Sequence, residues 1–246
     1  MIAQAQQFMN QNRTMLPAHK LLQLRQLGGV YFDLDGTLLD TAPDFQHVLN
    51  ELCADHGIAA PSPAAVQSTV SSGARALVAM AFTMSSEHAA FDGLLADMLQ
   101  RYGRQIQQSH ARLYPGMAAL IDRLEQEGIA WGVVTNKPAR FSQPLLSSLS
   151  LLSRCQVLIC PDDVRRTKPD PEPLLLAAAR TRRQAGSSIY AGDHPRDIDA
   201  GKAAGMTTIA AAYGYLPETP AIESWGADIV VNSVPEITQL LWPETD

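Results

Sequence analysis

Short apolar runs alternate with longer helix-like segments along most of the chain. The apolar runs, which are typical of buried strands, lie at residues 30–32, 130–134, 157–159, 189–191, 207–211 and 229–231. Segments with a helical pattern lie between and after them, at residues 117–127, 141–148, 173–179, 196–204 and 235–241. Strands that alternate with helices indicate βαβ units, so we expect an α/β fold with a doubly wound parallel sheet.

A stretch early in the chain breaks this alternation. Residues 44–111 show mostly helical patterns, at 45–56, 74–82 and 91–106, and we interpret them as an inserted helical cap. The core is then expected at residues 29–43 and 112–246, after an N-terminal extension at residues 1–28. The sequence therefore predicts a parallel-sheet core with a smaller helical unit inserted after the first strand.

The composition limits the partners that the protein can have. The chain has 25 acidic residues against 19 Lys and Arg, and the formal net charge of −6 argues against a nucleic-acid partner, which would require a basic surface. No apolar run approaches the length of a membrane span, and no signal-peptide pattern opens the sequence. The three cysteines form no CxxC pair, so we expect no disulfide framework, no zinc site and a cytoplasmic protein.

Two aspartates follow the first apolar run, in the sequence Asp33-Leu34-Asp35-Gly36-Thr37. Because alternate residues of an extended chain point to the same side, the carboxylates of Asp33 and Asp35 are expected to converge. Two such carboxylates repel each other unless a cation or a shared proton intervenes, and Mg²⁺ is a hard cation that prefers oxygen ligands. The motif therefore predicts a magnesium site that handles phosphate, with an ordinary turn or helix-cap pair of aspartates as the alternative.

Two further motifs offer groups that can hold a phosphate. Thr135 and Asn136 follow the apolar run at 130–134, and the Thr135 hydroxyl with the backbone N–H groups after it could bind phosphoryl oxygens, although Thr-Asn also occurs in ordinary turns. Lys168, in Lys-Pro-Asp-Pro, would by itself be interpreted as a solvated surface residue. Together with a pair of carboxylates, a fixed ammonium that offsets the charge of Asp33 and of a phosphate is the better interpretation.

The fourth motif is an acidic loop between an apolar run and a helix. Asp193 and Asp197 lie four residues apart in Gly-Asp-His-Pro-Arg-Asp. This spacing suits one direct metal ligand and a second residue that supports the metal, directly or through water. Asp197 could instead only stabilise the helix N-terminus, and Asp199 is expected to be a cap or surface residue.

These four motifs, in this order and each at the end of a strand, resemble the signature motifs of haloacid dehalogenase superfamily phosphatases over residues 29–241. The resemblance implies a Rossmann-like core with a helical cap and a phosphomonoester hydrolase that uses Mg²⁺ and a small-molecule substrate. It also implies roles for single residues: Asp33 as nucleophile, Asp35 as general acid and base, Thr135, Asn136 and Lys168 as phosphate-binding residues, and Asp33, Asp35, Asp193 and Asp197 as metal-binding residues. His194 departs from the small polar or acidic residue often found at its position.

Four stretches are similar to phosphoglycolate phosphatases and, more narrowly, to the bacterial N-acetylmuramic acid 6-phosphate phosphatases of cell-wall recycling. They lie at residues 41–45, 72–76, 131–138 and 160–164. The resemblance implies N-acetylmuramic acid 6-phosphate as the substrate, with 2-phosphoglycolate as the alternative. Gly73 and Arg75 are expected to determine specificity, because the glycine allows close backbone approach and the arginine offers a planar fork to a carboxylate. A helix start with an exposed arginine is the alternative for these two residues.

Other functions agree less well with the sequence. A β-phosphoglucomutase-like mutase shares the four motifs and stays open, whereas a dehalogenase would lack the carboxylate of Asp35. A non-enzymatic binding module would be expected to lack one of the motifs, and none is missing. The sequence contains no GxxxxGK[ST] loop and no GxGxxG turn for a nucleotide. The motifs leave the oligomeric state open.

Overall fold

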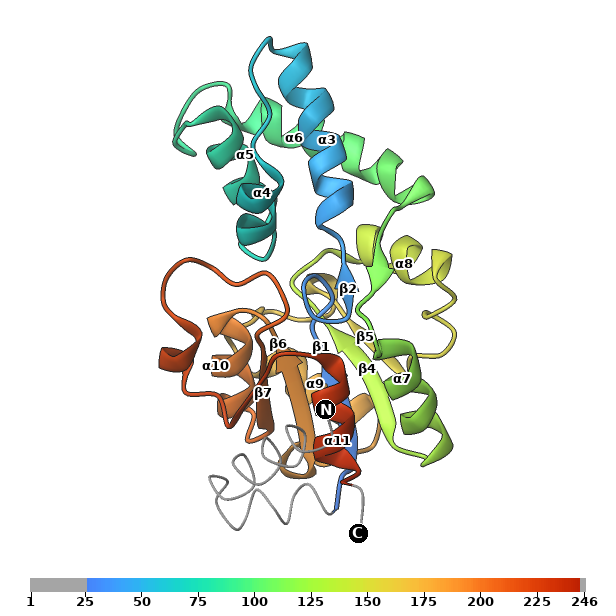
Figure 1. Ribbon diagram of the computed structural model, residues 1–246. Coiled ribbons are helices and arrows are strands. Elements are labelled where there is room, and N and C mark those ends of the chain that lie inside the picture. The colour runs from blue at the N-terminus through green and yellow to red at the C-terminus, as the bar shows by residue number, and fades with distance from the viewer. Residues whose placement is uncertain (1–25, 244–246) are drawn as a thin grey trace.

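The computed structural model describes residues 26–243, so the predicted N-terminal extension lies almost entirely outside the described residues. Six parallel strands form the central sheet in the order β5-β4-β1-β6-β7-β8 (Figure 1). Their bounds are β1 (Gly29–Phe32), β4 (Ala130–Val134), β5 (Val157–Ile159), β6 (Ser188–Gly192), β7 (Thr207–Ala211) and β8 (Ile229–Val231). The predicted parallel sheet is confirmed, and each strand ends within one residue of its predicted bounds.

Helices cover both faces of the sheet. Strand β1 is fully buried, with Val30 and Phe32 in the core layer on one face and Tyr31 in the layer on the other. The first layer is closed by α7 (Met117–Gln126), α8 (Ala139–Ser148) and α11 (Val234–Leu241), and the second by α9 (Glu172–Arg180) and α10 (Pro195–Ala203). Within residues 26–243, no helix combines the length and the hydrophobicity that a membrane span requires.

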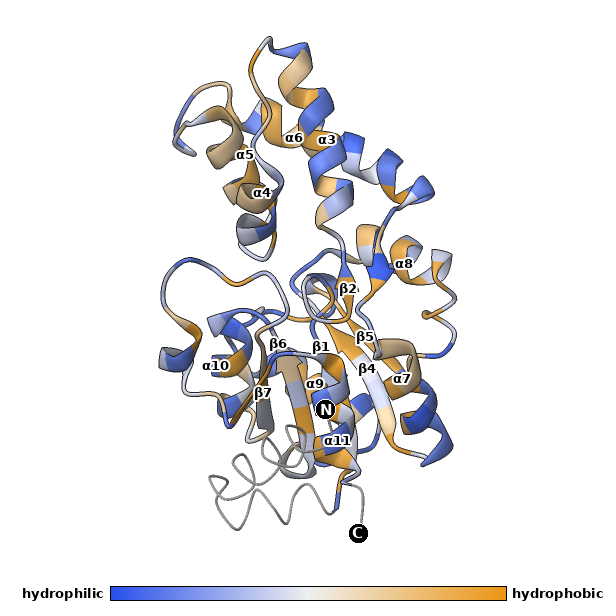
Figure 2. Ribbon diagram, in the orientation of Figure 1, coloured by the Kyte–Doolittle hydropathy of each residue, from blue (hydrophilic) through white to orange (hydrophobic). Residues whose placement is uncertain are grey.

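Four α-helices lie between β1 and α7 in the chain, and we call them the cap helices: α3 (Ala42–Asp55), α4 (Pro63–Val70), α5 (Ala74–Phe82) and α6 (Phe91–Gln105). They lie beyond the carboxyl edge of the sheet (Figure 1) and pack around a core of their own, which includes Leu49, Leu52 and Leu77. Figure 2 shows both hydrophobic and hydrophilic residues on α3 and α6, as expected for helices with one buried face.

A short antiparallel pair, β2 (Leu39–Asp40) and β3 (Arg112–Leu113), connects the cap helices to the sheet. Helix α3 begins at Ala42, two residues before the expected start of the cap, and β3 begins where the core was expected to resume. Helix α4, which is eight residues long, was not among the helices expected from the sequence. It begins after Ser62, whose hydroxyl accepts a hydrogen bond from the Ala65 N–H at 3.3 Å.

Candidate active site

Three carboxylates meet at the carboxyl edge of the sheet. Asp33 follows β1, and Asp193 follows β6, which pairs with β1 in parallel. Asp197 lies in the first turn of α10, so the loop after β6 brings it to the same place. One oxygen of each carboxylate lies within 4.8 Å of the other two. The structure thus brings together three of the four predicted metal-binding residues.

The chemistry of this cluster fits a divalent cation. Burial raises the pKa of Asp193 well above its ordinary value, and the neighbouring charges of Asp33 and Asp197 raise it further. Ionised carboxylates that share one buried place repel one another, and a cation with oxygen ligands would remove that repulsion. The cluster is therefore suited to Mg²⁺.

A buried ammonium group offsets part of this negative charge. The Nζ atom of Lys168 lies 2.9 Å from an Asp33 oxygen and 2.7 Å from an Asp197 oxygen. It also donates a hydrogen bond to the Tyr190 hydroxyl at 2.7 Å. Burial lowers the pKa of Lys168, but Asp197 and Asp33 raise it by more, so the net shift is upward. Lys168 therefore stays charged and holds the Asp33 carboxylate in one orientation.

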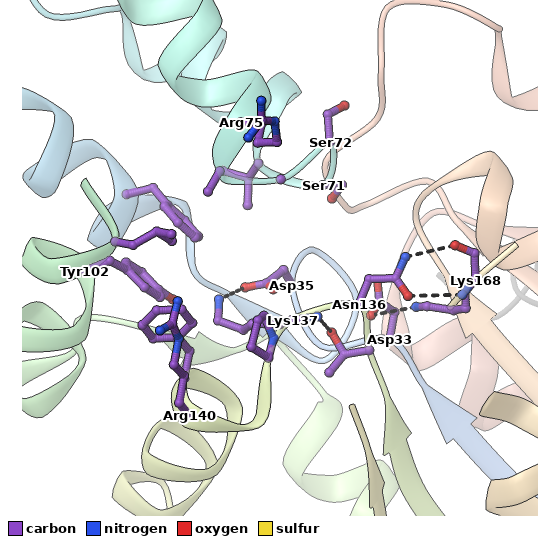
Figure 3. A pocket seen from close by; sticks show the side chains of 18 of the residues that line it. Asp33, Asp35, Ser71, Ser72, Arg75, Tyr102, Asn136, Lys137, Arg140 and Lys168 are labelled. Atoms are coloured by element: carbon purple, nitrogen blue, oxygen red, sulfur yellow. Dashed lines mark hydrogen bonds and ion pairs between the residues drawn. The ribbon is translucent and has the colours of Figure 1, made fainter. Parts of the chain in front are cut away.

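The carboxylate of Asp35 is turned away from this cluster. Its Oδ1 atom accepts a hydrogen bond from Nζ of Lys137 at 2.7 Å (Figure 3). The same atom accepts a hydrogen bond from the Thr41 hydroxyl at 2.5 Å. The place of Asp35 among the metal-binding residues stays a prediction. Gly36, in the loop after β1, lies directly against the Asp193 carboxylate. It has a φ of +78°, and a Cβ at this position would overlap that carboxylate. The motif requires its glycine for this close approach.

The two residues after β4 lie beside the cluster but use their side chains differently. Thr135 is buried, and its hydroxyl accepts a hydrogen bond from the Lys137 N–H at 3.1 Å. The Asn136 carboxamide donates to the Lys168 carbonyl at 3.0 Å and accepts from the Lys168 N–H at 3.2 Å (Figure 3). The amide of Asn136 therefore fixes the backbone that carries Lys168, and the phosphate-binding roles of Thr135 and Asn136 stay predictions.

A cavity of about 490 Å³ extends from the sheet edge toward the cap helices (Figure 3). Its polar end includes Asp33, Asp35 and Lys168. The remaining lining comes from Phe45, Val70, Ser71, Ser72, Gly73, Ala74, Arg75, Leu95, Leu99, Tyr102, Thr135, Asn136, Lys137, Pro138, Arg140, Phe141 and Arg196. Every predicted site residue lines this cavity except Asp193 and Asp197, which lie close to Asp33 in the carboxylate cluster.

Lys137 and two aromatic residues were missed by the sequence analysis. The ammonium of Lys137 is buried and lies over the rings of Phe45 and Tyr102, at 4.9 and 4.6 Å from their centroids. The two rings, from α3 and α6, stack with their centroids 4.2 Å apart. Lys137 directly follows the Thr-Asn motif, which was a usable signal. The sequence contained no comparable signal for the pair Phe45 and Tyr102, because these two residues are far apart in the chain.

Ser71, Arg196 and His194 connect a cap loop to the start of α10. The Ser71 hydroxyl donates to an Asp193 oxygen at 2.8 Å, and the Arg196 guanidinium donates to the Ser71 carbonyl. Burial and the nearby Arg196 lower the pKa of His194 to about 4, so its ring is neutral, and Nδ1 accepts the Arg196 N–H at 3.3 Å. His194 thus caps α10 and orients Arg196.

Gly73 and Arg75 lie on the cap side of the cavity. Gly73 has a φ of +91°, and a Cβ there would meet no atom within 4 Å, so its backbone conformation and not crowding favours glycine. The Arg75 guanidinium lies 3.6 Å from Asp92 and 4.8 Å from the centroid of the Phe91 ring. Both residues line the cavity, and their roles in specificity stay predictions.

The parallel sheet, the cap helices and the carboxylate cluster define a hydrolase of one family. Residues 30–211 match the haloacid dehalogenase-like hydrolases, and the chain belongs to this family. The predicted superfamily is therefore confirmed.

Several relatives of similar length are phosphatases. The chain is 43% identical to the N-acetylmuramic acid 6-phosphate phosphatase of Pseudomonas putida, over 88% of this chain and 96% of that protein. It is 40% identical to a phosphoglycolate phosphatase of Xanthomonas campestris pv. campestris, over 87% of this chain and 97% of that protein. A predicted phosphoglycolate phosphatase from Haemophilus somnus shares the fold, with a TM-score of 0.77 and 24% sequence identity. The match covers 87% of this chain and 98% of that chain. The protein is accordingly a phosphomonoester hydrolase.

Proposed function

We propose that the protein hydrolyses N-acetylmuramic acid 6-phosphate to N-acetylmuramic acid and phosphate in the cytoplasm, with Mg²⁺ and an aspartyl-phosphate on Asp33. The observation that carries this proposal is the 43% identity, over nearly the full length of both chains, to a phosphatase named for that substrate. A second Pseudomonas phosphatase of the same name, from Pseudomonas aeruginosa, is 42% identical over 88% of this chain.

The first step is the transfer of the phosphoryl group to Asp33. A carboxylate oxygen of Asp33 attacks phosphorus while the bond between phosphorus and the sugar oxygen breaks. Asp35, which lines the same cavity, gives its proton to the departing oxygen. The charge of Lys168, 2.9 Å from Asp33, offsets the negative charge that both the carboxylate and the phosphate bring to the site.

The second step releases the phosphate. Asp35, now a carboxylate, takes a proton from a water molecule that attacks phosphorus, and the bond between phosphorus and the Asp33 oxygen breaks. Nζ of Lys137, 2.7 Å from Asp35 Oδ1, and the Thr41 hydroxyl hold this carboxylate on the cavity side of the loop. One residue thereby serves as the acid in the first step and as the base in the second.

Asp33 and Asp193 would hold the metal ion most directly. The Asp197 oxygens already accept hydrogen bonds from Lys168 at 2.7 Å and from the His194 N–H at 3.1 Å, so Asp197 would mainly support the ion from behind. When bound, Mg²⁺ supplies positive charge to the phosphoryl oxygens.

The volume and the lining of the cavity are compatible with a sugar phosphate as the ligand. The cavity volume of about 490 Å³ is within the range of pockets that enclose drug-sized ligands, about 300–1,000 Å³. A two-carbon acid such as 2-phosphoglycolate would leave much of that space to water. Apolar side chains on the cap side, including Val70, Leu95 and Leu99, suit the methyl groups of an acetamido sugar with a lactyl ether.

The second candidate substrate is 2-phosphoglycolate, which the name of the Xanthomonas relative favours. Both candidates carry a carboxylate in addition to the phosphate ester, so the presence of a positive side chain in the cavity does not distinguish between them. The size of the cavity supports the sugar phosphate, because 2-phosphoglycolate would not fill it.

Product analysis tests the reaction type. Incubation of the purified protein with N-acetylmuramic acid 6-phosphate and Mg²⁺ should give N-acetylmuramic acid and inorganic phosphate in equal amounts, as measured by mass spectrometry and a phosphate assay. A mutase would instead give an isomeric sugar phosphate of unchanged mass, with no phosphate released. That product, or an unchanged substrate, would contradict the proposal.

A further inference from the structure

Five cationic side chains line the cavity, and four of them are engaged by other protein groups. Lys168 is bound to Asp33 and Asp197, as described above. Lys137 is bound to Asp35 at 2.7 Å, and Arg75 lies 3.6 Å from Asp92. Arg196 donates to the Ser71 carbonyl and, at 3.2 Å, to Nδ1 of His194. Arg140 is the fifth of these cations.

Arg140 forms no ion pair or hydrogen bond through its side chain within residues 26–243. Its guanidinium lies over the ring of Phe141, 4.6 Å from the centroid. Such a contact limits the motion of an arginine while its hydrogen-bond donors stay available to a ligand. Arg140 therefore presents an anchored but uncompensated positive charge to the cavity.

The stability of helix α8 does not explain an arginine at this position. Arg140 lies in the first turn of α8 (Ala139–Ser148), where the partial positive charge of the helix disfavours a cation. The acidic group at this helix start is Asp162, which accepts a hydrogen bond from the Ala139 N–H at 2.9 Å but forms no ion pair with Arg140 in the described part of the chain. A solvated surface arginine is the alternative, since Arg140 is exposed in the absence of a ligand.

The position of Arg140 suits the end of the substrate that does not react. Figure 3 shows Asp33 and Lys168 together on one side of Asp35 and Lys137, with Arg140 beside the aromatic residues on the other side. A substrate whose phosphate lies at Asp33 would reach Arg140 only with a more distant group. The planar fork of a guanidinium binds a carboxylate through two parallel hydrogen bonds.

We infer that Arg140, and not Arg75, binds the carboxylate of the substrate and so determines the preference for an acidic sugar phosphate. This inference rests on the proposed function. Arg75 is less suited to the role because Asp92 already pairs with its guanidinium on the cap side. A carboxylate bound by Arg75 would have to compete with that of Asp92.

A pair of substrates that differ only in the carboxylate-bearing group tests this assignment. N-acetylglucosamine 6-phosphate is the same sugar phosphate without the lactyl ether of N-acetylmuramic acid 6-phosphate. We expect the wild-type protein to favour N-acetylmuramic acid 6-phosphate over N-acetylglucosamine 6-phosphate by at least tenfold in kcat/KM. Arg140→Gln should reduce this ratio by tenfold or more, mainly through the KM of the acid, and Arg140→Lys should retain part of it because the charge remains.

Two further variants complete the test. Arg75→Gln should leave the ratio of the two kcat/KM values largely intact. Arg104→Gln, which removes the same charge from an exposed position on α6 that does not line the cavity, should leave it unchanged. Melting temperatures of all variants establish that they are folded.

The outcomes separate the inference from the proposed function. A high wild-type ratio that persists in Arg140→Gln overturns the role of Arg140 and leaves the proposed substrate intact. If the preference for N-acetylmuramic acid 6-phosphate is lost in Arg75→Gln and kept in Arg140→Gln, the carboxylate binds to Arg75 on the cap, and the inference is overturned too. A wild-type ratio near one contradicts the proposed substrate, and the inference falls with it.

Discussion

Asp33 is held by two contacts that fall on the same oxygen. Its Oδ1 atom accepts a hydrogen bond from the Leu34 N–H at 2.8 Å and lies 2.9 Å from Nζ of Lys168. Burial raises the pKa of Asp33, Lys168 lowers it and Asp197 raises it again, so the net shift is upward. Among the described residues, no group binds the second oxygen of Asp33. That oxygen is available for attack on phosphorus.

Asp33→Asn tests whether this residue carries the phosphoryl group. The amide keeps the shape of the side chain but lacks the anionic oxygen, so we expect kcat to fall by about a thousandfold or more. The melting temperature should stay close to that of the wild type, because the replacement also relieves the repulsion from Asp197. Turnover within tenfold of the wild type would exclude Asp33 as the nucleophile.

The metal-binding role of Asp193 has its own test. Asp193→Asn removes one charge from the cluster, so the Mg²⁺ concentration for half-maximal activity should rise about ten- to a hundredfold. In the wild type, Mg²⁺ should also raise the melting temperature, and this rise should be smaller in the variant. Asp199→Asn, at an exposed position, is the matched control. An Mg²⁺ titration that is the same for both variants would contradict the assignment.

The cap helices contribute to the catalytic loop as well as to the roof of the cavity. Phe45 from α3 and Tyr102 from α6 stack on each other and lie under the ammonium of Lys137, which binds Asp35. Tyr102 also packs edge to face on Phe141 of α8, with ring centroids 5.4 Å apart. These contacts connect two cap helices with the core residues that position Asp35.

Replacement of Tyr102 tests this connection. Tyr102→Leu removes a buried ring, and we expect a loss of about 1–3 kcal/mol in the free energy of unfolding, measured by urea denaturation. It should also lower kcat, because Lys137 loses one of the two rings that fix it. Tyr102→Phe keeps the ring and serves as the control. If the two variants have the same kcat, the aromatic pair does not act on the catalytic loop.

The sequence predicted the elements of the core better than those of the cap. The six strands are largely buried on both faces, so each appears as a run of mostly apolar and β-branched residues. The two-residue strands β2 and β3 are too short for a periodic pattern, and neither they nor helix α4 was predicted. The carboxylate cluster followed from parallel strands that share an edge. The contacts of Lys137 and Ser71 depend on how the cap packs, which local pattern does not specify.

In the whole molecule, the charged residues at the sheet edge face a largely apolar lining from the cap helices. The sheet edge supplies Asp33, Lys168 and the acidic loop of α10, while the cap helices supply most of the apolar lining. In the proposed mechanism, the phosphate binds at the sheet edge whatever group it is attached to. We therefore expect the remaining contacts, with the cap helices and the first turn of α8, to distinguish one phosphomonoester from another.

The most direct test of the account compares kcat/KM for N-acetylmuramic acid 6-phosphate and for 2-phosphoglycolate under the same conditions with saturating Mg²⁺. We predict that the sugar phosphate is preferred by at least tenfold, which corresponds to about 1.4 kcal/mol of differential transition-state binding. A tenfold preference for 2-phosphoglycolate would contradict the proposed substrate and show that the large cavity does not select for a sugar.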